Sequence, residues 1–292
     1  MLTEKSESLP IEQFLINLKA NPLFWFIKDS SFESFIQIQH QRVNRVINLS
    51  TSENELKLLF AVLDGVSSQM EIAGLSQFGI KGAFYVSHLV ALGFPNGSVH
   101  QELKSREILT ATDVLKSINV WLHEQMQRIE GVDYTDPLSI PGMAATFALV
   151  DSKKREVTIA HTADTLACAC KEQLKSSFIR KINTPGGCGI LNGMSALVEN
   201  GLVFETSIEI TQDVDSVFLF SDGALIPFSE GRNFGETTAL IIKKFQSPQL
   251  GVTVLEEGAK ILENDSGFQK IPRLKLRDDA TFLRITFGKE NW

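Results

Sequence analysis

The chain has 292 residues, of which 43% are apolar and 22% charged, a composition typical of a globular protein with a substantial core. Its 28 Lys and Arg residues against 35 Asp and Glu give a formal charge of −7, and the absence of any run of five basic residues argues against a nucleic-acid surface. No apolar stretch approaches the roughly 20 residues of a membrane-spanning helix, and the first residues lack a secretory signal pattern, so we expect a cytoplasmic protein with no membrane partner.

The three cysteines are Cys168, Cys170 and Cys188. Their odd number and the lack of a Cys-x-x-Cys spacing argue against a disulfide framework and against a structural zinc site, which fits a reducing compartment. Cys168 and Cys170 stand two apart in an apolar run, so we interpret them as small core residues on one side of a strand.

In the first half of the chain, apolar spacing predicts an amphipathic helix over 9–27, interrupted near Pro22. Alternation over 32–40 and a near-continuous apolar run over 56–63 predict strands, and helical spacing returns over 72–93 and 112–129. We interpret residues 1–31 as a helical extension and 32–292 as one domain.

The second half has a β texture, with predicted strands over 144–150, 156–163, 166–170 and 178–182 that we interpret as a meander. Residues 184–201 contain Pro185 and several glycines, which favours a mobile loop or flap. Strands over 202–210 and 214–220, helices over 235–245 and 252–262, and a last strand over 280–287 complete the order. This order predicts an α+β fold in which two helical layers enclose two antiparallel sheets.

Three aspartates stand next to apolar strands, namely Asp64 and Asp222 after a strand and Asp278 just before one. Carboxylates at the ends of core strands can converge although they are far apart in sequence, and a divalent cation relieves their repulsion. Oxygen-only ligation points to Mg²⁺ or Mn²⁺ rather than zinc. A glycine follows Asp64 and Asp222, which lets the backbone turn sharply near an ion. Asp-Gly after a strand is also a common turn without a metal, so each element alone is a weak signal.

Four short motifs together resemble a known family, the protein phosphatase 2C family of metal-dependent Ser/Thr phosphatases. In chain order they are Asp64-Gly65, Thr162-Ala163-Asp164-Thr165, Ser221-Asp222-Gly223-Ala224 and Asp278-Asp279-Ala280-Thr281. The family has Asp-Gly, Gly-Asp-Ser, Ser-Asp-Gly and Asp-Asn or Asp-Asp followed by a hydrophobic residue and Thr. The stretch Gly142-Met143-Ala144-Ala145-Thr146 is similar to a small-residue strand start in that family.

The resemblance implies a four-layer α-β-β-α sandwich and hydrolysis of phosphoserine or phosphothreonine in a protein substrate by a metal-activated water. It implies that Asp64, Asp222 and Asp278 ligate one or two Mn²⁺ or Mg²⁺ ions and that Gly65 offers its carbonyl oxygen. Arg42 would clamp the phosphate, and residues 184–201 would form the flap beside the site.

One departure from the family concerns an Arg-x-x-x-Glu-Asp pattern, because Val46 and Ile47 follow Arg42 where the acidic pair is expected. The resemblance then implies an incomplete first metal site. Two functions stay open: a phosphatase of reduced activity, and a pseudophosphatase that serves as a regulatory or binding module. His161 allows two readings as well, a general acid for the leaving group or a structural strand residue.

Overall fold

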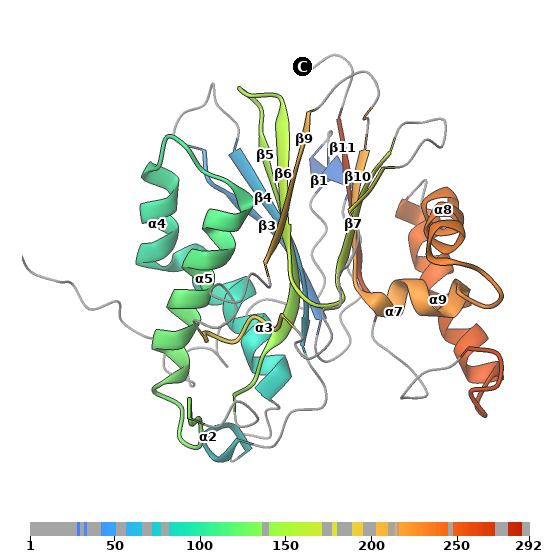
Figure 1. Ribbon diagram of the computed structural model, residues 1–292, viewed down its shortest axis with the longest axis horizontal. Helices are drawn as coiled ribbons and strands as arrows, with labels where there is room; N and C mark the ends of the chain where they lie inside the picture. The colour runs from blue at the N-terminus through green and yellow to red at the C-terminus, as the bar shows by residue number, and fades with distance from the viewer. Residues whose placement is uncertain are drawn as a thin grey trace, which may run out of the picture.

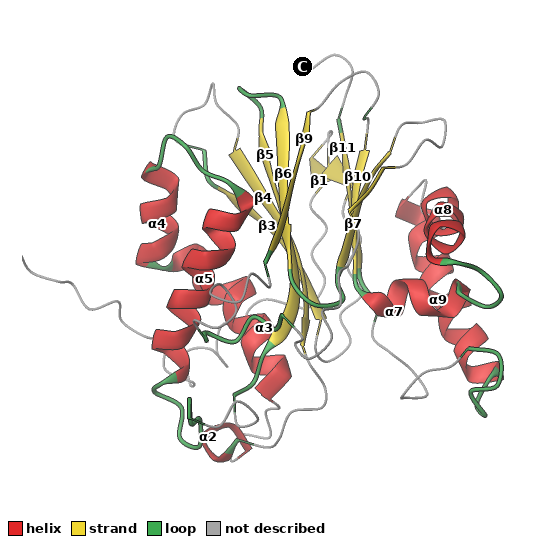
Figure 2. Cartoon of the chain, viewed as in Figure 1, coloured by secondary structure: helices red, strands yellow, loops and turns green. Residues whose placement is uncertain are grey.

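Two antiparallel sheets face each other, and helices cover the outer face of each (Figures 1 and 2). This is the predicted α+β sandwich of four layers. The computed structural model describes residues 28–29, 32–33, 42–50, 57–65, 72–76, 82–135, 140–170, 177–179, 189–194, 203–209, 214, 216–244, 248–271 and 280–287. In this part of the chain no helix is long and apolar enough to cross a membrane.

The first sheet has five strands in the order β3-β4-β5-β6-β9, and each neighbouring pair is antiparallel. Their bounds are Arg42–Asn48 for β3, Lys57–Gly65 for β4, Met143–Asp151 for β5, Glu156–His161 for β6 and Phe204–Glu209 for β9. The central strands β4 and β5 are buried along their whole length, which explains their continuous apolar sequence.

The second sheet has four strands in the order β11-β10-β7-β8. Their bounds are Leu166–Cys170 for β7, Ser177–Ile179 for β8, Ser216–Phe220 for β10 and Phe282–Thr286 for β11. A separate pair, β1 (Lys28–Asp29) and β2 (Phe32–Glu33), is antiparallel and spans the boundary expected between residues 31 and 32.

Helices α2 (Ala73–Ser76), α3 (Gly82–Gly93), α4 (Ser98–Ser105) and α5 (Ala111–Met126) lie on the side of the first sheet (Figure 1). Helices α7 (Asp222–Leu225), α8 (Phe234–Lys244) and α9 (Pro248–Asn264) lie on the side of the second. In the described residues, short 3₁₀ turns are η1 (Phe94–Asn96) and η3 (Ile226–Phe228).

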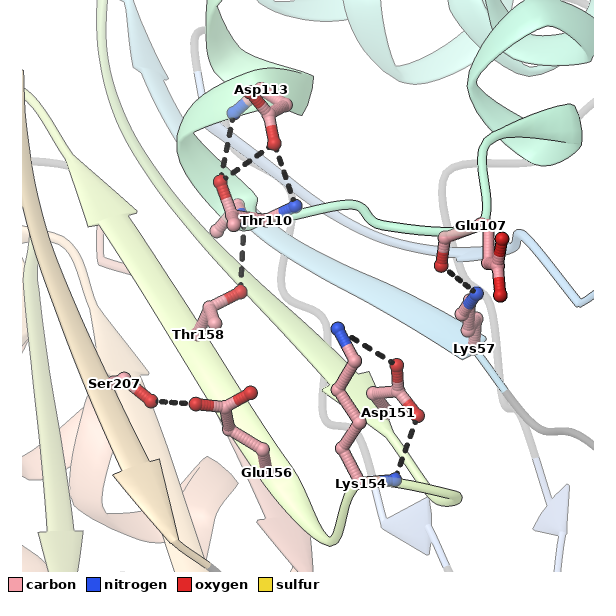
Figure 3. Close-up of polar contacts among 10 residues, drawn as sticks. Lys57, Glu107, Thr110, Asp113, Asp151, Lys154, Glu156, Thr158 and Ser207 are labelled. Carbon is pink, nitrogen blue, oxygen red and sulfur yellow. Dashed lines mark hydrogen bonds and ion pairs between the residues drawn. The ribbon is translucent and has the colours of Figure 1, made fainter.

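The start of α5 is fixed by a capping box, in which Thr110 and Asp113 exchange side-chain to backbone hydrogen bonds (Figure 3). The hydroxyl of Thr158 on β6 accepts the Ala111 N–H at 2.9 Å, so the sheet itself satisfies another free amide of this helix end. These bonds fix the start of α5 relative to the sheet on which the helix packs.

The described apolar residues form three cores: one between the first sheet and its helices, one between the two sheets, and one between the second sheet and its helices. Along β4, Leu59 and Leu63 pack toward α3 and α5, whereas Phe60 and Val62 pack toward the second sheet. Cys168 is buried with the third core, under α7 to α9, as expected for a small core residue.

The predicted meander over 144–182 is wrong at one connection, because β5 and β6 belong to the first sheet and β7 and β8 to the second. Strand β3 and helix α4 were not predicted, since β3 has no apolar alternation and α4 is only eight residues long with two apolar residues, Val99 and Leu103. The helix expected over 9–27 lies outside the described residues, as does most of the strand expected over 32–40.

Candidate functional site

The core between the sheets becomes polar where β4 ends. Phe60 and Val62 lie in that core, and because side chains alternate along a strand, Asp64 is on the same face. Asp64 is buried, with 5% of its surface exposed. A carboxylate in such a position needs compensating partners, because a charge removed from water is costly.

The turn between β6 and β7 shows that the Asp64 end of the first sheet and the Asp222 end of the second are the same end of the sandwich. Residues 162–165 cross from His161, the last residue of β6, to Leu166, the first of β7 (Figure 1). Leu166 pairs with Phe220, the last residue of β10, and Asp222 follows two positions later. The two predicted carboxylates are therefore brought to one end of the sandwich, which we call the Asp64 edge.

Buried hydroxyl groups join the two sheets at this edge. The Thr146 hydroxyl donates to that of Thr165 at 2.8 Å, and the Thr162 hydroxyl accepts the Ala145 N–H at 3.1 Å. Ala163, at the tip of the turn, has a φ of 50°, a left-handed conformation that costs a non-glycine residue free energy. These threonines occur in motifs that the sequence offers, but the sequence alone does not indicate that their hydroxyl groups bond to one another and to the backbone here.

A second hydroxyl fixes the position of Asp222. Ser221 donates its N–H to the Thr281 carbonyl at 3.0 Å, and its hydroxyl accepts the Thr281 N–H at 3.0 Å. This exchange locks the end of β10 to the start of β11, so the half-buried Asp222 begins α7 from a fixed point. The third predicted ligand, Asp278, lies outside the described residues.

Gly65 has a structural reason to be glycine that the sequence did not reveal. A Cβ atom built on Gly65 would lie 2.6 Å from the Ala83 carbonyl oxygen, at the start of α3. The glycine thus lets α3 approach the end of β4, whether or not its own carbonyl binds an ion.

The strand register changes the expected role of residues 42–47. Arg42 pairs with Asp64, whereas Val46 and Ile47 pair with Phe60 and Leu59, four and five positions further along β3. Four residues of strand span about 13 Å. The expectation that Val46 and Ile47 mark the missing acidic pair is therefore wrong, because acids there would stand far along β3 from Asp64. Arg42 is level with Asp64 in the register, and its role as a phosphate clamp stays a prediction.

His161 is buried at the end of β6, with 1% of its surface exposed. Burial lowers the pKa of His161 to about 4, so its ring is neutral at pH 7. A neutral imidazole ring that is enclosed by protein is a poor general acid for a leaving group. This favours the structural reading of His161.

Part of the predicted flap is an anchored segment. Residues 189–194 pack against the first sheet, where Leu191 forms an isolated antiparallel bridge with Met143. The expectation of a mobile loop is thus wrong for these residues, and the rest of 184–201 is outside the described part. Asn119 of α5 bonds to this segment through both ends of its amide, a contact that helical periodicity could not predict.

The donors at this edge suit a hard cation. Asp64 and Asp222 supply carboxylate oxygens, which match Mg²⁺ or Mn²⁺ better than zinc. Within the described ranges, no three His, Cys, Asp or Glu residues stand close enough to hold an ion by themselves. A third carboxylate, such as that of Asp278, would have to complete the set.

No protein-family model matches the chain, and no curated protein matches its sequence. Solved structures do match. A bacterial serine phosphatase is 13% identical with a TM-score of 0.53, and the match covers 87% of this chain and 94% of that one. The serine/threonine phosphatase Stp1 from Staphylococcus aureus is 13% identical with a TM-score of 0.52, covering 86% and 91%. At this identity the likeness establishes a shared fold.

Proposed function

We propose that the chain is a metal-dependent phosphoprotein phosphatase that hydrolyses phosphoserine or phosphothreonine. The observation that supports this proposal is that the strands carrying or preceding Asp64 and Asp222 finish at the same end of a sandwich whose fold is shared with serine/threonine phosphatases. Fold alone does not assign a reaction, so the proposal depends on the chemistry of that edge.

The residues have distinct proposed roles. Asp64 and Asp222 hold the cation, with Asp278 as the third carboxylate and the Gly65 carbonyl as a further ligand. Arg42, in register with Asp64, binds the phosphoryl oxygens. A bound Mn²⁺ or Mg²⁺ supplies an activated water and neutralises charge on the phosphoryl group. Phosphorylated proteins are the proposed partners, and the cytoplasm is the proposed location.

A second candidate function is a pseudophosphatase that binds a phosphoprotein without turnover. Its support is the set of neighbours of Asp64: the register partners on its two sides are Arg42 and Ala144, neither of which is a carboxylate. The first metal position would then be weak, and the fold would act as a regulatory or binding module.

Calorimetric titration with Mn²⁺, followed by assays on p-nitrophenyl phosphate and a phosphothreonine peptide, tests the proposal. We expect metal binding and metal-dependent hydrolysis in the wild type, and loss of both in D64N, D222N and D278N. Asp151 is the matched control, since it is equally buried at 5% exposure but stands at the opposite end of β5. D151N should keep both properties. Binding of Mn²⁺ without hydrolysis would favour the pseudophosphatase, and absence of both would reject the enzyme.

A further inference from the structure

Residues 189–194 complete the first sheet beyond the end of β6. Leu191 donates its N–H to the Met143 carbonyl at 2.8 Å and accepts the Met143 N–H at 3.1 Å. Since β6 leaves this sheet after His161, Leu191 occupies the place beside β5 that β6 would otherwise fill. Met143 is fully buried, so without Leu191 its backbone groups would lose their partners away from water.

Asn119 is the side chain that holds this segment from the helical layer. It is buried, its Oδ1 accepts the Gly193 N–H at 2.9 Å, and its Nδ2 donates to the Met194 carbonyl at 2.9 Å. Gly193 has a φ of +86°, and a Cβ there would lie 2.6 Å from the His123 backbone nitrogen on α5. The segment and α5 therefore fit together this closely only with glycine at position 193.

The same attachment reaches the Asp64 edge through β5. Successive residues of a strand turn their backbone groups to opposite neighbours, so while Met143 turns to Leu191, Ala144 turns to β4, where its register partner is Asp64. Gly65, the residue after Asp64 in β4, packs closely against Ala83 of α3. Because α3 leaves no free space beside Gly65, a shift at the end of β5 would move Asp64 or Gly65.

We propose that Asn119 is a positioning residue for the Asp64–Gly65 end of β4. By fixing Gly193 and Met194 it keeps Leu191 on Met143, and this bridge holds the end of β5 against which Asp64 is paired. The metal-binding consequence rests on the proposed function, whereas the effect on the backbone of β5 does not.

The test compares N119A with T110A in the full chain. Thr110 caps the N-terminal end of α5, whereas Asn119 lies in the middle of the helix, so T110A weakens the same helix without touching residues 189–194. We expect hydrogen–deuterium exchange over 142–147 to become at least tenfold faster in N119A and to change less than twofold in T110A. The dissociation constant for Mn²⁺ should rise at least fivefold in N119A and less than twofold in T110A. Both variants are measured at the same number of degrees below their own Tm, so that a general loss of stability does not produce the difference.

Two further variants protect the test against misfolding. N119D keeps an acceptor for Gly193 but loses the donor to Met194, so it should give an intermediate effect; G193A should reproduce N119A while leaving Asn119 intact. Unchanged exchange in N119A, or equal effects of N119A and T110A on exchange or on Mn²⁺ affinity, would overturn the proposal. A wild type that binds no Mn²⁺ would reject the proposed function instead, and the exchange comparison would then decide the role of Asn119 by itself.

Discussion

Thr146 on β5 donates a hydrogen bond of 2.8 Å to Thr165, and this bond joins the two sheets beside the candidate site. Thr165 in turn donates to the Thr162 carbonyl at 3.3 Å. Both hydroxyl groups are fully buried. The bond therefore sets how the edge that carries Asp64 faces the edge that carries Asp222.

The two threonines should differ in the cost of their replacement. T146V removes a donor and leaves Thr165 its own bond to Thr162, so we expect a loss of about 1 kcal/mol in the free energy of unfolding. T165V leaves the buried Thr146 hydroxyl without this acceptor, and the expected loss is about 2–3 kcal/mol. Urea unfolding measures both. T206V on β9, an exposed position, is the control, and equal losses in T146V and T165V would contradict this account of the bond.

Ala163 should respond to glycine in the opposite way from most residues. Its φ of 50° is strained for a side chain with a Cβ, at roughly 1–2 kcal/mol, although glycine also gains freedom in the unfolded chain. We expect A163G to raise the free energy of unfolding by up to about 1 kcal/mol and A163V to lower it. Thermal unfolding of the three proteins checks the order. A163G melting below the wild type would show that the turn is not strained.

Gly65 should not tolerate a methyl group. The Cβ of G65A would meet the Ala83 backbone at 2.6 Å, and overpacking of this kind costs about 1–3 kcal/mol. Gly267 offers a control, because a Cβ there meets only the Gln269 side chain at 3.6 Å. Chemical denaturation of G65A and G267A compares the two. Equal stability of the two variants would mean that α3 can move away from β4 at little cost.

Two buried histidines should make the fold sensitive to acid. Burial lowers the pKa of His88 and of His161 to about 4, from an ordinary 6.5. Between these values the unfolded chain binds more protons than the folded one, so the free energy of unfolding falls as the pH falls, by up to about 1.4 kcal/mol per histidine and pH unit. We expect stability to be full above about pH 6.5 and to decline toward pH 4.

His88 can be tested separately, since it lies in α3, where its Nδ1 bonds to the Phe84 carbonyl at 2.9 Å. H88Q should lose less stability than the wild type between pH 7.5 and pH 5 in urea unfolding. V86A is the control at a buried position of the same helix and should lower stability equally at both pH values, since it removes only apolar atoms. A wild-type pH dependence retained in H88Q would assign the acid sensitivity to other groups.

The sequence by itself determined the elements of the sandwich and the kind of residue at its edge. Apolar runs and helical spacing are local patterns, so they located β4, β5, β10 and α5 within a few residues and placed Asp64 and Asp222 directly after strands. The oxygen chemistry of a hard cation followed from residue types alone. Strand β3 has no apolar alternation, and it was missed for that reason.

Only the tertiary structure decided which of these residues meet. The crossing of residues 162–165 between sheets, the pairing of Arg42 with Asp64, and the bond that the Gly193 N–H donates to Asn119, 74 residues earlier in the chain, depend on contacts between distant segments. Hydrophobic periodicity reports which face of an element is buried, but carries no information on its partner or register. The correction for Val46 and Ile47, the close approach of Gly65 to Ala83 and the proposed role of Asn119 all depend on strand register and on contacts between distant segments.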